Sequence, residues 1–108
     1  MPFNTTNLSG LLIYEPRVFE DNRGCFFEAY NEHTFQQQGI DISFVQDNQS
    51  FSSYGVIRGL HYQLSPHAQS KLVRVLHGEI LDVAVDIRTG SPTFGEVFCI
   101  ELLAENKK

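Results

Sequence analysis

The sequence predicts a mainly β fold, an antiparallel sandwich or barrel with one short helix. Short runs rich in β-branched and aromatic residues recur along the 108 residues, separated by turn-forming Gly, Pro, Asn and Asp. Only one segment carries helix start and stop signals. Nine Phe and no Trp suit a β-rich core. The length predicts a single domain, residues 1–108, that buries roughly two-thirds of the surface of its unfolded chain.

The N-terminal third is predicted to hold two strands and a turn. "LLIYEPRVF" (11–19) is expected to be extended, and Pro16 favours an edge position or a bulge. "DNRG" (21–24) is typical of a turn, and "CFFEAY" (25–30) follows it as a strand.

The segment "NEHTFQQQG" (31–39) is the one predicted helix. Asn31 can cap its N-terminus, and Glu32 favours the first turn. Gly39 suits the position just past the C-terminus.

The remainder of the chain is predicted to be strands and turns. Apolar residues alternate most clearly in "EILDVAVDIR" (79–88), and "RTGSPTFG" (88–95) is a turn-rich loop. His77-Gly78-Glu79 is predicted as a hairpin turn. The strands expected after the helix are 42–51, 55–63, 70–78, 79–88 and 96–103.

Charge and composition exclude several classes of protein. The net charge of −5, without any Lys/Arg run, argues against a general nucleic-acid binder. No apolar run reaches membrane-spanning length, and the first ten residues lack a signal-peptide pattern. We therefore expect a cytoplasmic protein in which Cys25 and Cys99 are reduced and fill space in the core.

An arginine and a histidine interrupt the predicted strand "GVIRGLHYQ" (55–63). His61 is suited to moving protons near neutral pH, but a half-buried strand histidine bonded to one carbonyl is the favoured interpretation from this residue alone. Alternation places Arg58 and His61 on opposite faces. They share a cavity only if the strand bulges or twists, and a bulge costs least at Gly59.

Two further polar features each have a functional and a structural interpretation. Lys71 either points inward at the mouth of its strand, where it would stabilise a negative oxygen, or lies exposed at the strand end. Gln46, Asp47 and Asn48 suit hydrogen bonding to a polyhydroxylated ligand, and suit a polar strand end at least as well.

Arg23 and Glu28 flank the aromatic run in "RGCFFE" (23–28). The simplest interpretation is an ion pair at the rim of a core of phenylalanines. A metal site is rejected, because no His-x-His pair occurs among the histidines at positions 33, 61, 67 and 77.

Five segments carry a family resemblance along nearly the whole chain. They are "RVFEDNRGCFFEAYN", "FVQDNQS", "GVIRGLHYQ", "KLVRVLHGEILDVAVDIR" and "SPTFGE". In order and spacing they resemble the dTDP-4-dehydrorhamnose 3,5-epimerases, cupin-fold enzymes of dTDP-L-rhamnose synthesis. "RGLHYQ" followed by "KLVRV" is the most specific part. The chain resembles the N-terminal portion of that family.

The resemblance implies a cupin-like jelly roll and a set of site residues. His61 matches the general base of the family, and Lys71 matches the lysine near the ketone oxygen of the sugar. The N-terminal strands are exchanged in the family's dimer, which implies a homodimer or larger assembly. The positions that match the dTDP-sugar site are Arg23, Glu28, Gln46, Asp47, Asn48, Arg58 and Lys71.

The implied reaction is epimerisation of dTDP-4-dehydro-6-deoxy-D-glucose at carbons 3 and 5 to dTDP-4-dehydro-L-rhamnose. It needs a base, a group that stabilises the enolate and an acid across the ring. No cofactor is implied, because the ketone of the substrate is the electron sink.

The chain departs from the family in one respect. The resemblance places the family's tyrosine acid, and the aspartate that orients the base, beyond residue 108, and none of the four tyrosines matches that acid. Two hypotheses follow: an epimerase that carries the base half of its site, or a truncated cupin that binds a nucleotide-sugar or only assembles, without turnover.

The last predicted strand also predicts association. Phe98, Ile100 and Leu102 alternate on one face of 96–103, and its backbone edge is expected to be unpaired. We therefore expect an inter-chain contact at or near this strand.

Overall fold

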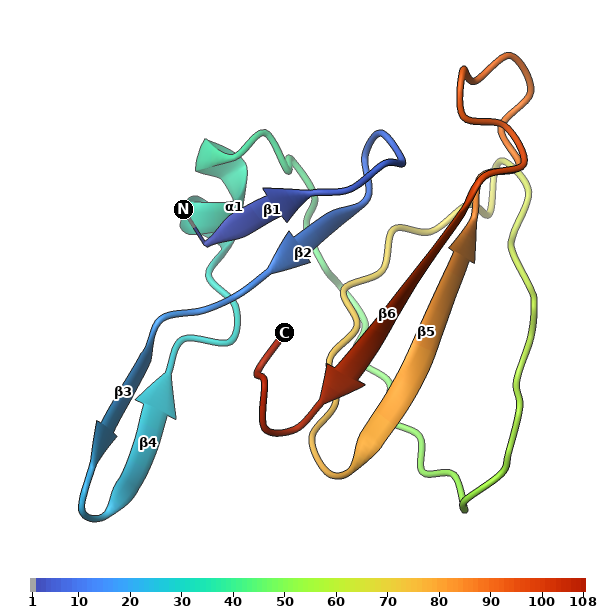
Figure 1. Ribbon diagram of the computed structural model, residues 1–108. Helices are drawn as coiled ribbons and strands as arrows, with labels where there is room; N and C mark the ends of the chain where they lie inside the picture. Colours follow the sequence, from blue (N-terminus) through green and yellow to red (C-terminus); the bar gives the residue numbers. More distant parts are fainter. Residues whose placement is uncertain (1) are drawn as a thin grey trace. The chain divides into compact units, whose positions relative to one another are not determined.

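Residues 2–108 are described by a computed structural model that contains six strands and one helix (Figure 1). Each strand pairs with its neighbour in sequence, so the strands form three antiparallel pairs. The elements are β1 (Phe3–Thr5), β2 (Leu12–Tyr14), β3 (Val18–Asp21), β4 (Gly24–Phe27), α1 (Glu32–Gln37), β5 (Glu79–Val85) and β6 (Val97–Leu103).

The chain forms two compact units. One comprises the chain up to Asn31 together with Val73–Lys108, and it holds all six strands. The other is Glu32–Leu72, which holds α1 and most of the segment between α1 and β5.

The predicted strand 11–19 is divided in two. β2 ends at Tyr14 and β3 begins at Val18, so Pro16 lies in the break between them. Proline cannot donate a backbone hydrogen bond to a ladder, which is the physical reason for the break. β2 pairs with β1, a three-residue strand too short to give a recognisable sequence pattern.

β3 and β4 form the hairpin that the turn signal predicts. Asp21 pairs with Gly24, which leaves Asn22 and Arg23 as the two turn residues. Gly24 has φ 139°, a conformation that favours glycine. β4 ends at Phe27, three residues before the predicted limit.

The predicted helix is confirmed, with bounds slightly inside the predicted range 31–39. Phe35 is its buried residue, and its carbonyl accepts hydrogen bonds from the backbone N–H groups of Gln38 and Ile40. Gly39 has φ 84°, as expected for the residue that ends a helix.

β5 and β6 form the longest ladder, from Glu79 opposite Leu103 to Val85 opposite Val97. Directly opposed residues of an antiparallel pair point to the same face. Phe98, Ile100 and Leu102 lie on the more covered face, and Leu102 is buried. The expectation that this face is the exposed one is therefore wrong. The exposed apolar residues lie on the opposite face: Leu81, Val83 and Val97, beside Cys99.

The loop between β5 and β6 is fixed by Asp86, whose side chain is only 1 % exposed. Its carboxylate accepts hydrogen bonds from the N–H, Nε and Nη2 of Arg88 at 2.9–3.0 Å. It also accepts from the hydroxyls of Ser91 and Thr93, both at 2.6 Å. These bonds, with Arg88 first, hold the pKa of Asp86 well below its usual range. The loop predicted over 88–95 is thus an ordered one.

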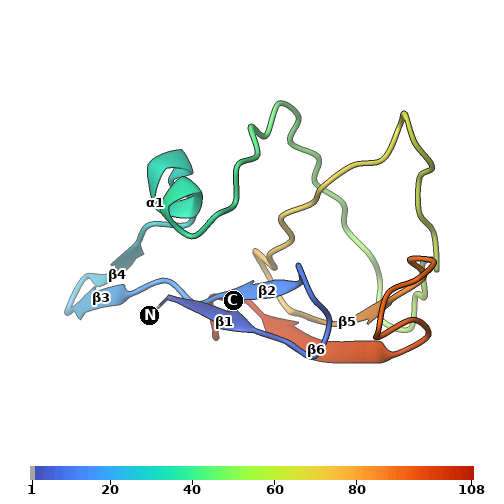
Figure 2. The same ribbon diagram turned by 90° about the horizontal axis from the view of Figure 1, so that it is seen from above.

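The strands predicted over 42–51, 55–63 and 70–78 are not formed, and this segment is coil in both views (Figure 2). A residue pattern favours an extended chain, but a strand also needs a neighbour for its backbone N–H and C=O groups. Among the described residues these stretches have no ladder partner. Since no strand leads directly into Gly78, the predicted hairpin at 77–79 is absent as well.

The described residues bury little apolar surface. Only Leu8, Phe35 and Leu102 are buried hydrophobic residues among them. The accessible surface is 9045 Å², against about 6100 Å² for a compact monomer of this mass. The chain therefore buries about half of its unfolded surface rather than two-thirds. Cys25 and Cys99 are exposed and free, so the prediction that both fill the core is wrong.

Candidate active site

The predicted site residues are divided between the two units. Gln46, Asp47, Asn48, Arg58, His61 and Lys71 belong to Glu32–Leu72, whereas Arg23 and Glu28 belong to the unit that holds the strands. All eight are exposed. In fact every side chain from Val45 to Arg74 is exposed, including apolar ones such as Ile57, at 93 %.

The position of His61 depends on Gly59. Gly59 has φ 99°, so the chain leaves the extended path at the residue where a bulge would cost least. A Cβ added at Gly59 would lie 3.4 Å from Nδ1 of His61. Such a Cβ would touch the imidazole at van der Waals distance, and the left-handed φ would strain any residue other than glycine at position 59.

Arg58 closes the loop that precedes it. Its Nε donates to Oγ of Ser52 at 2.9 Å, and its Nη2 donates to the carbonyl of Phe51 at 3.2 Å. These bonds fix the direction of the guanidinium and leave its remaining N–H donors for a ligand. No sequence pattern indicates Ser52 as a partner, because the two residues are six positions apart in an irregular loop.

Two of the three polar residues at 46–48 are linked. Nε2 of Gln46 donates to Oδ1 of Asn48 at 3.2 Å, as expected for residues two apart in an extended chain. Asp47 lies between them. The structure thus orients the two amides together, and each keeps further donor and acceptor positions for other hydrogen bonds.

Arg23 pairs with Asp21 rather than with Glu28. Its Nη2 lies 2.7 Å and its Nε 3.2 Å from Oδ2 of Asp21, and its N–H donates to Oδ1 at 2.8 Å. Hydrogen bonds from Arg23 lower the pKa of Asp21. The predicted Arg23–Glu28 ion pair is therefore wrong, and Phe26, at 71 % exposed, is no core residue.

The partner of Arg23 had a detectable signal in the sequence. Asp-x-Arg occurs at Asp21–Arg23 and again at Asp86–Arg88, and both pairs make the same combination of backbone and guanidinium bonds. The carboxylate in each case accepts the N–H two residues later, which is the local turn that Asp favours.

Glu28 lies at the end of the hairpin, in contact with two neighbours. Its side chain accepts a hydrogen bond from Nδ2 of Asn31 at 3.2 Å, and its carbonyl accepts one from the hydroxyl of Tyr14 at 2.9 Å. Burial, followed by the charge of Glu28, raises the pKa of Tyr14. Tyr14 is thus a hydrogen-bond donor to the backbone here.

His61 and Lys71 have the chemistry of a base and of a cationic oxyanion stabiliser. Neither makes a hydrogen bond or ion pair with another residue of 2–108. Both side chains are therefore available to a bound molecule. Within the same residues no group of three His, Cys, Asp or Glu side chains is placed to hold a metal ion. The described helix, of six residues, is too short to cross a membrane.

Comparison with protein families matches residues 5–108 to dTDP-4-dehydrorhamnose 3,5-epimerase. Among curated proteins, the enzyme of that name from Shigella flexneri is 55 % identical over 104 residues, which are 95 % of this chain and 58 % of the relative. The one from Pseudomonas aeruginosa is 57 % identical over 99 residues, 91 % of this chain and 54 % of the relative.

Solved structures give the same result. The dTDP-4-dehydrorhamnose 3,5-epimerase from Elizabethkingia anophelis is 55 % identical, with a TM-score of 0.91 over 97 % of this chain and 58 % of that one. The dTDP-6-deoxy-D-glucose-3,5-epimerase from Legionella pneumophila, in complex with dTDP-4-keto-L-rhamnose, is 50 % identical, with a TM-score of 0.90 over 96 % of this chain and 55 % of that one.

These comparisons confirm the predicted fold class, mainly β, antiparallel and cupin-like with one short helix. The chain spans somewhat more than half the length of the relatives that it matches. In the matched part it has their backbone path, including the stretch from residue 42 to residue 78 that forms no strand here.

Proposed function

Because the chain belongs to the dTDP-4-dehydrorhamnose 3,5-epimerase family, we propose that it carries the proton-abstracting part of that activity. The substrate would be dTDP-4-dehydro-6-deoxy-D-glucose, epimerised at carbons 3 and 5. The observation that carries the proposal is the proximity of Gly59 and His61, in which a left-handed glycine lies beside an exposed imidazole that has no partner among residues 2–108.

His61 is assigned as the base. The hydrogens on the carbons beside a ketone are acidic, because the electron pair left behind moves into the carbonyl group. A neutral imidazole removes such a proton, the C–H electrons form the C=C bond of an enolate, and the imidazolium forms. Return of a proton to the opposite face then inverts the carbon.

Lys71 is assigned the role of stabilising the enolate. Its ammonium carries the charge needed beside the oxygen that becomes negative, and a positioned cation lowers the barrier most where the charge develops. Its exposure and its lack of a partner among residues 2–108 are consistent with this role.

Binding of the dTDP-sugar is assigned to the remaining residues. Arg58, held by Ser52 and Phe51, has free N–H donors for the diphosphate. The linked amides of Gln46 and Asn48, with Asp47 between them, suit hydroxyl groups. Arg23 and Glu28 lie on or beside the β3–β4 hairpin, from which they would serve the site of a neighbouring subunit if these strands are exchanged.

A second function has support from the burial pattern. An exposed base that meets no carboxylate within the described part of the chain favours binding or assembly without turnover. Solvent deuterium incorporation into dTDP-4-dehydro-6-deoxy-D-glucose, followed by mass spectrometry and proton NMR, separates the two functions. Exchange supports the base assignment, even without net epimerisation. Bound substrate that does not exchange supports a binding protein and contradicts the epimerase proposal.

Assembly and compartment are part of the same proposal. A homodimer or larger oligomer is supported by the exposed apolar face of β5 and β6, made by Leu81, Val83 and Val97. In this oligomer the subunits would exchange their N-terminal strands. A reducing, cytoplasmic location is supported by the free thiols of Cys25 and Cys99.

A further inference from the structure

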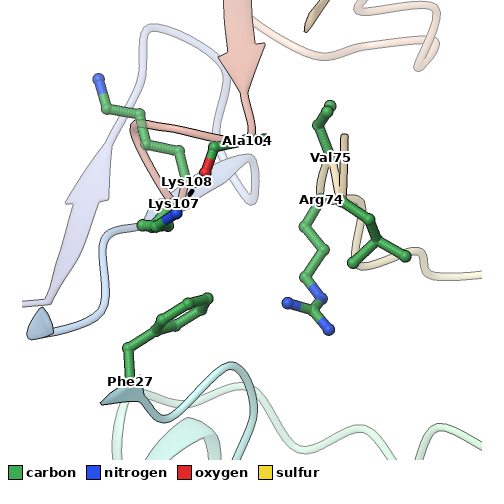
Figure 3. Close-up of a pocket in the computed structure, with 7 residues that line it drawn as sticks. Phe27, Arg74, Val75, Ala104, Lys107 and Lys108 are labelled. Atoms are coloured by element: carbon green, nitrogen blue, oxygen red, sulfur yellow. Dashed lines mark hydrogen bonds between the residues drawn. The ribbon is translucent and has the colours of Figure 1, made fainter. Parts of the chain in front are cut away.

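A cavity of about 140 Å³ lies beside the C-terminal residues, and none of the residues assigned to the dTDP-sugar lines it (Figure 3). It is lined by Phe27, Arg74, Val75, Leu76, Ala104, Lys107 and Lys108, all within the unit that holds the strands. Three of these seven residues are cationic and none is acidic. In a chain with a net charge of −5, such a collection of positive charge needs an explanation.

Arg74 supplies the first cationic group. Its guanidinium points into the space beside the ring of Phe27 (Figure 3). No hydrogen bond or ion pair joins it to another residue of the described chain, 2–108. All five of its N–H donors are therefore available to an anion.

Lys107 supplies the second group, and its side chain is held in place. Its Nζ donates to the carbonyl of Ala104 at 2.8 Å and lies 5.7 Å from the centre of the Phe27 ring. An ammonium group has three donors, so two remain for another acceptor. The ammonium of Lys108 points away from the cavity (Figure 3), and its Nζ lies 3.9 Å from Oε1 of Glu15.

The size and lining of the cavity define the class of ligand. Its volume corresponds to about four or five water molecules, which is room for a tetrahedral oxyanion. A guanidinium fork and a fixed ammonium are the groups that bind phosphate oxygens. We propose that Arg74 and Lys107 form a binding site for a phosphate dianion, either free or at the end of a small phosphomonoester.

The experiment is a titration of the full chain with sodium phosphate, followed by ¹H–¹⁵N NMR, with sodium chloride at matched ionic strength as the reference. For a ligand of this size a Kd on the order of 1 mM is expected. Saturable shifts should be confined to the amides around Phe27, Arg74 and Lys107. A second titration uses phenyl phosphate. If it binds more tightly than inorganic phosphate, the ligand of the site is a phosphomonoester. If the two bind equally, the ligand is free phosphate.

Three variants test the assignment. Arg74→Gln and Lys107→Asn should each weaken phosphate binding by about tenfold. Asn tolerates the positive φ of residue 107, 60°, so the second variant keeps the backbone. Arg17→Gln is the matched control, because it removes the same charge from a side chain that stacks on Phe19 outside the cavity.

The proposal is overturned by any of three results. These are shifts that do not saturate, shifts that chloride reproduces, and an effect of Arg17→Gln as large as that of Arg74→Gln. The last would mean that the anion responds only to overall charge.

Discussion

Gly59 and His61 share one space: a Cβ on the first would lie 3.4 Å from Nδ1 of the second, at the short end of van der Waals contact. Gly59 also has a left-handed φ of 99°, a conformation that favours glycine. The residue two positions before the proposed base thus needs the backbone freedom of glycine, and the arrangement can be tested without assuming that the reaction occurs.

Gly59→Ala should destabilise the chain and change the surroundings of the imidazole. An alanine at φ 99° costs about 1–2 kcal/mol, and its methyl group would lie in van der Waals contact with His61. Gly55→Ala is the matched control, because Gly55 has φ 87° but open space around its added Cβ. Urea unfolding should show similar losses for both, whereas the ring resonances of His61 should move only in Gly59→Ala. Equal movement in both variants would contradict the contact.

His61→Ala should abolish deuterium exchange into the substrate and leave the fold intact, because the side chain is exposed and unpaired among residues 2–108. Mass spectrometry measures the exchange and circular dichroism the fold. His67→Ala, which removes another exposed histidine, should exchange at the parental rate. If His61→Ala also kept that rate, the base would have to be another group.

Lys71→Ala should slow the same exchange by about tenfold to a thousandfold, through loss of enolate stabilisation. Lys71→Arg should retain part of the rate, since it keeps the charge but not the geometry. Initial exchange rates at saturating substrate measure both. An unchanged rate in Lys71→Ala would mean that the Lys71 side chain faces solvent and takes no part in the reaction.

Asp86→Asn should lower the thermal midpoint by roughly 5–10 °C at pH 7, because the buried carboxylate accepts five hydrogen bonds, three of them from Arg88. Asp41→Asn, at an exposed position, should change it little.

The effect of Asp86 should also depend on pH in a defined direction. Its folded-state pKa lies below the ordinary value of 3.8, so the stabilisation is present above that value and is lost as the pH falls through the folded-state pKa. Denaturation of parent and Asp86→Asn from pH 7 down to pH 2 should therefore give a difference that is constant to about pH 4 and shrinks below it. A difference that grew in acid would contradict the sign.

Val83→Lys should weaken self-association by about hundredfold, because it places a charge at the centre of the exposed face of β5 and β6. Sedimentation equilibrium measures the association constant of parent and variant. Cys99 lies opposite Val83 on the same face, so it should react with a thiol reagent more slowly than Cys25 in the assembled parent. A compact parental monomer at micromolar concentration, or equal reactivity of the two thiols, would contradict this interface.

Much of the local structure was predictable because it depends on neighbours in sequence. Gly39 ends the helix and Gly24 follows the β3–β4 turn, and both need the backbone freedom of glycine where they stand. The motif around His61 was enough to identify the family, and the unusual φ of Gly59 follows from the same residues. The assignment of His61 and Lys71 to the reaction remains a prediction.

Other features depend on which segments meet, and the sequence alone could not decide them. Residues 42–51, 55–63 and 70–78 have the composition of strands, but a strand exists only where another chain segment satisfies its backbone, and none of residues 2–108 does so. The alternation of apolar and polar residues predicted two faces for β5 and β6, but it did not indicate which face is covered. The bond between Arg23 and Asp21 is local by contrast, and the Asp-x-Arg spacing indicates it. Local backbone preferences and contacts two residues apart are thus set by the sequence, whereas strand pairing and burial are set by the tertiary structure, because each depends on groups far along the chain.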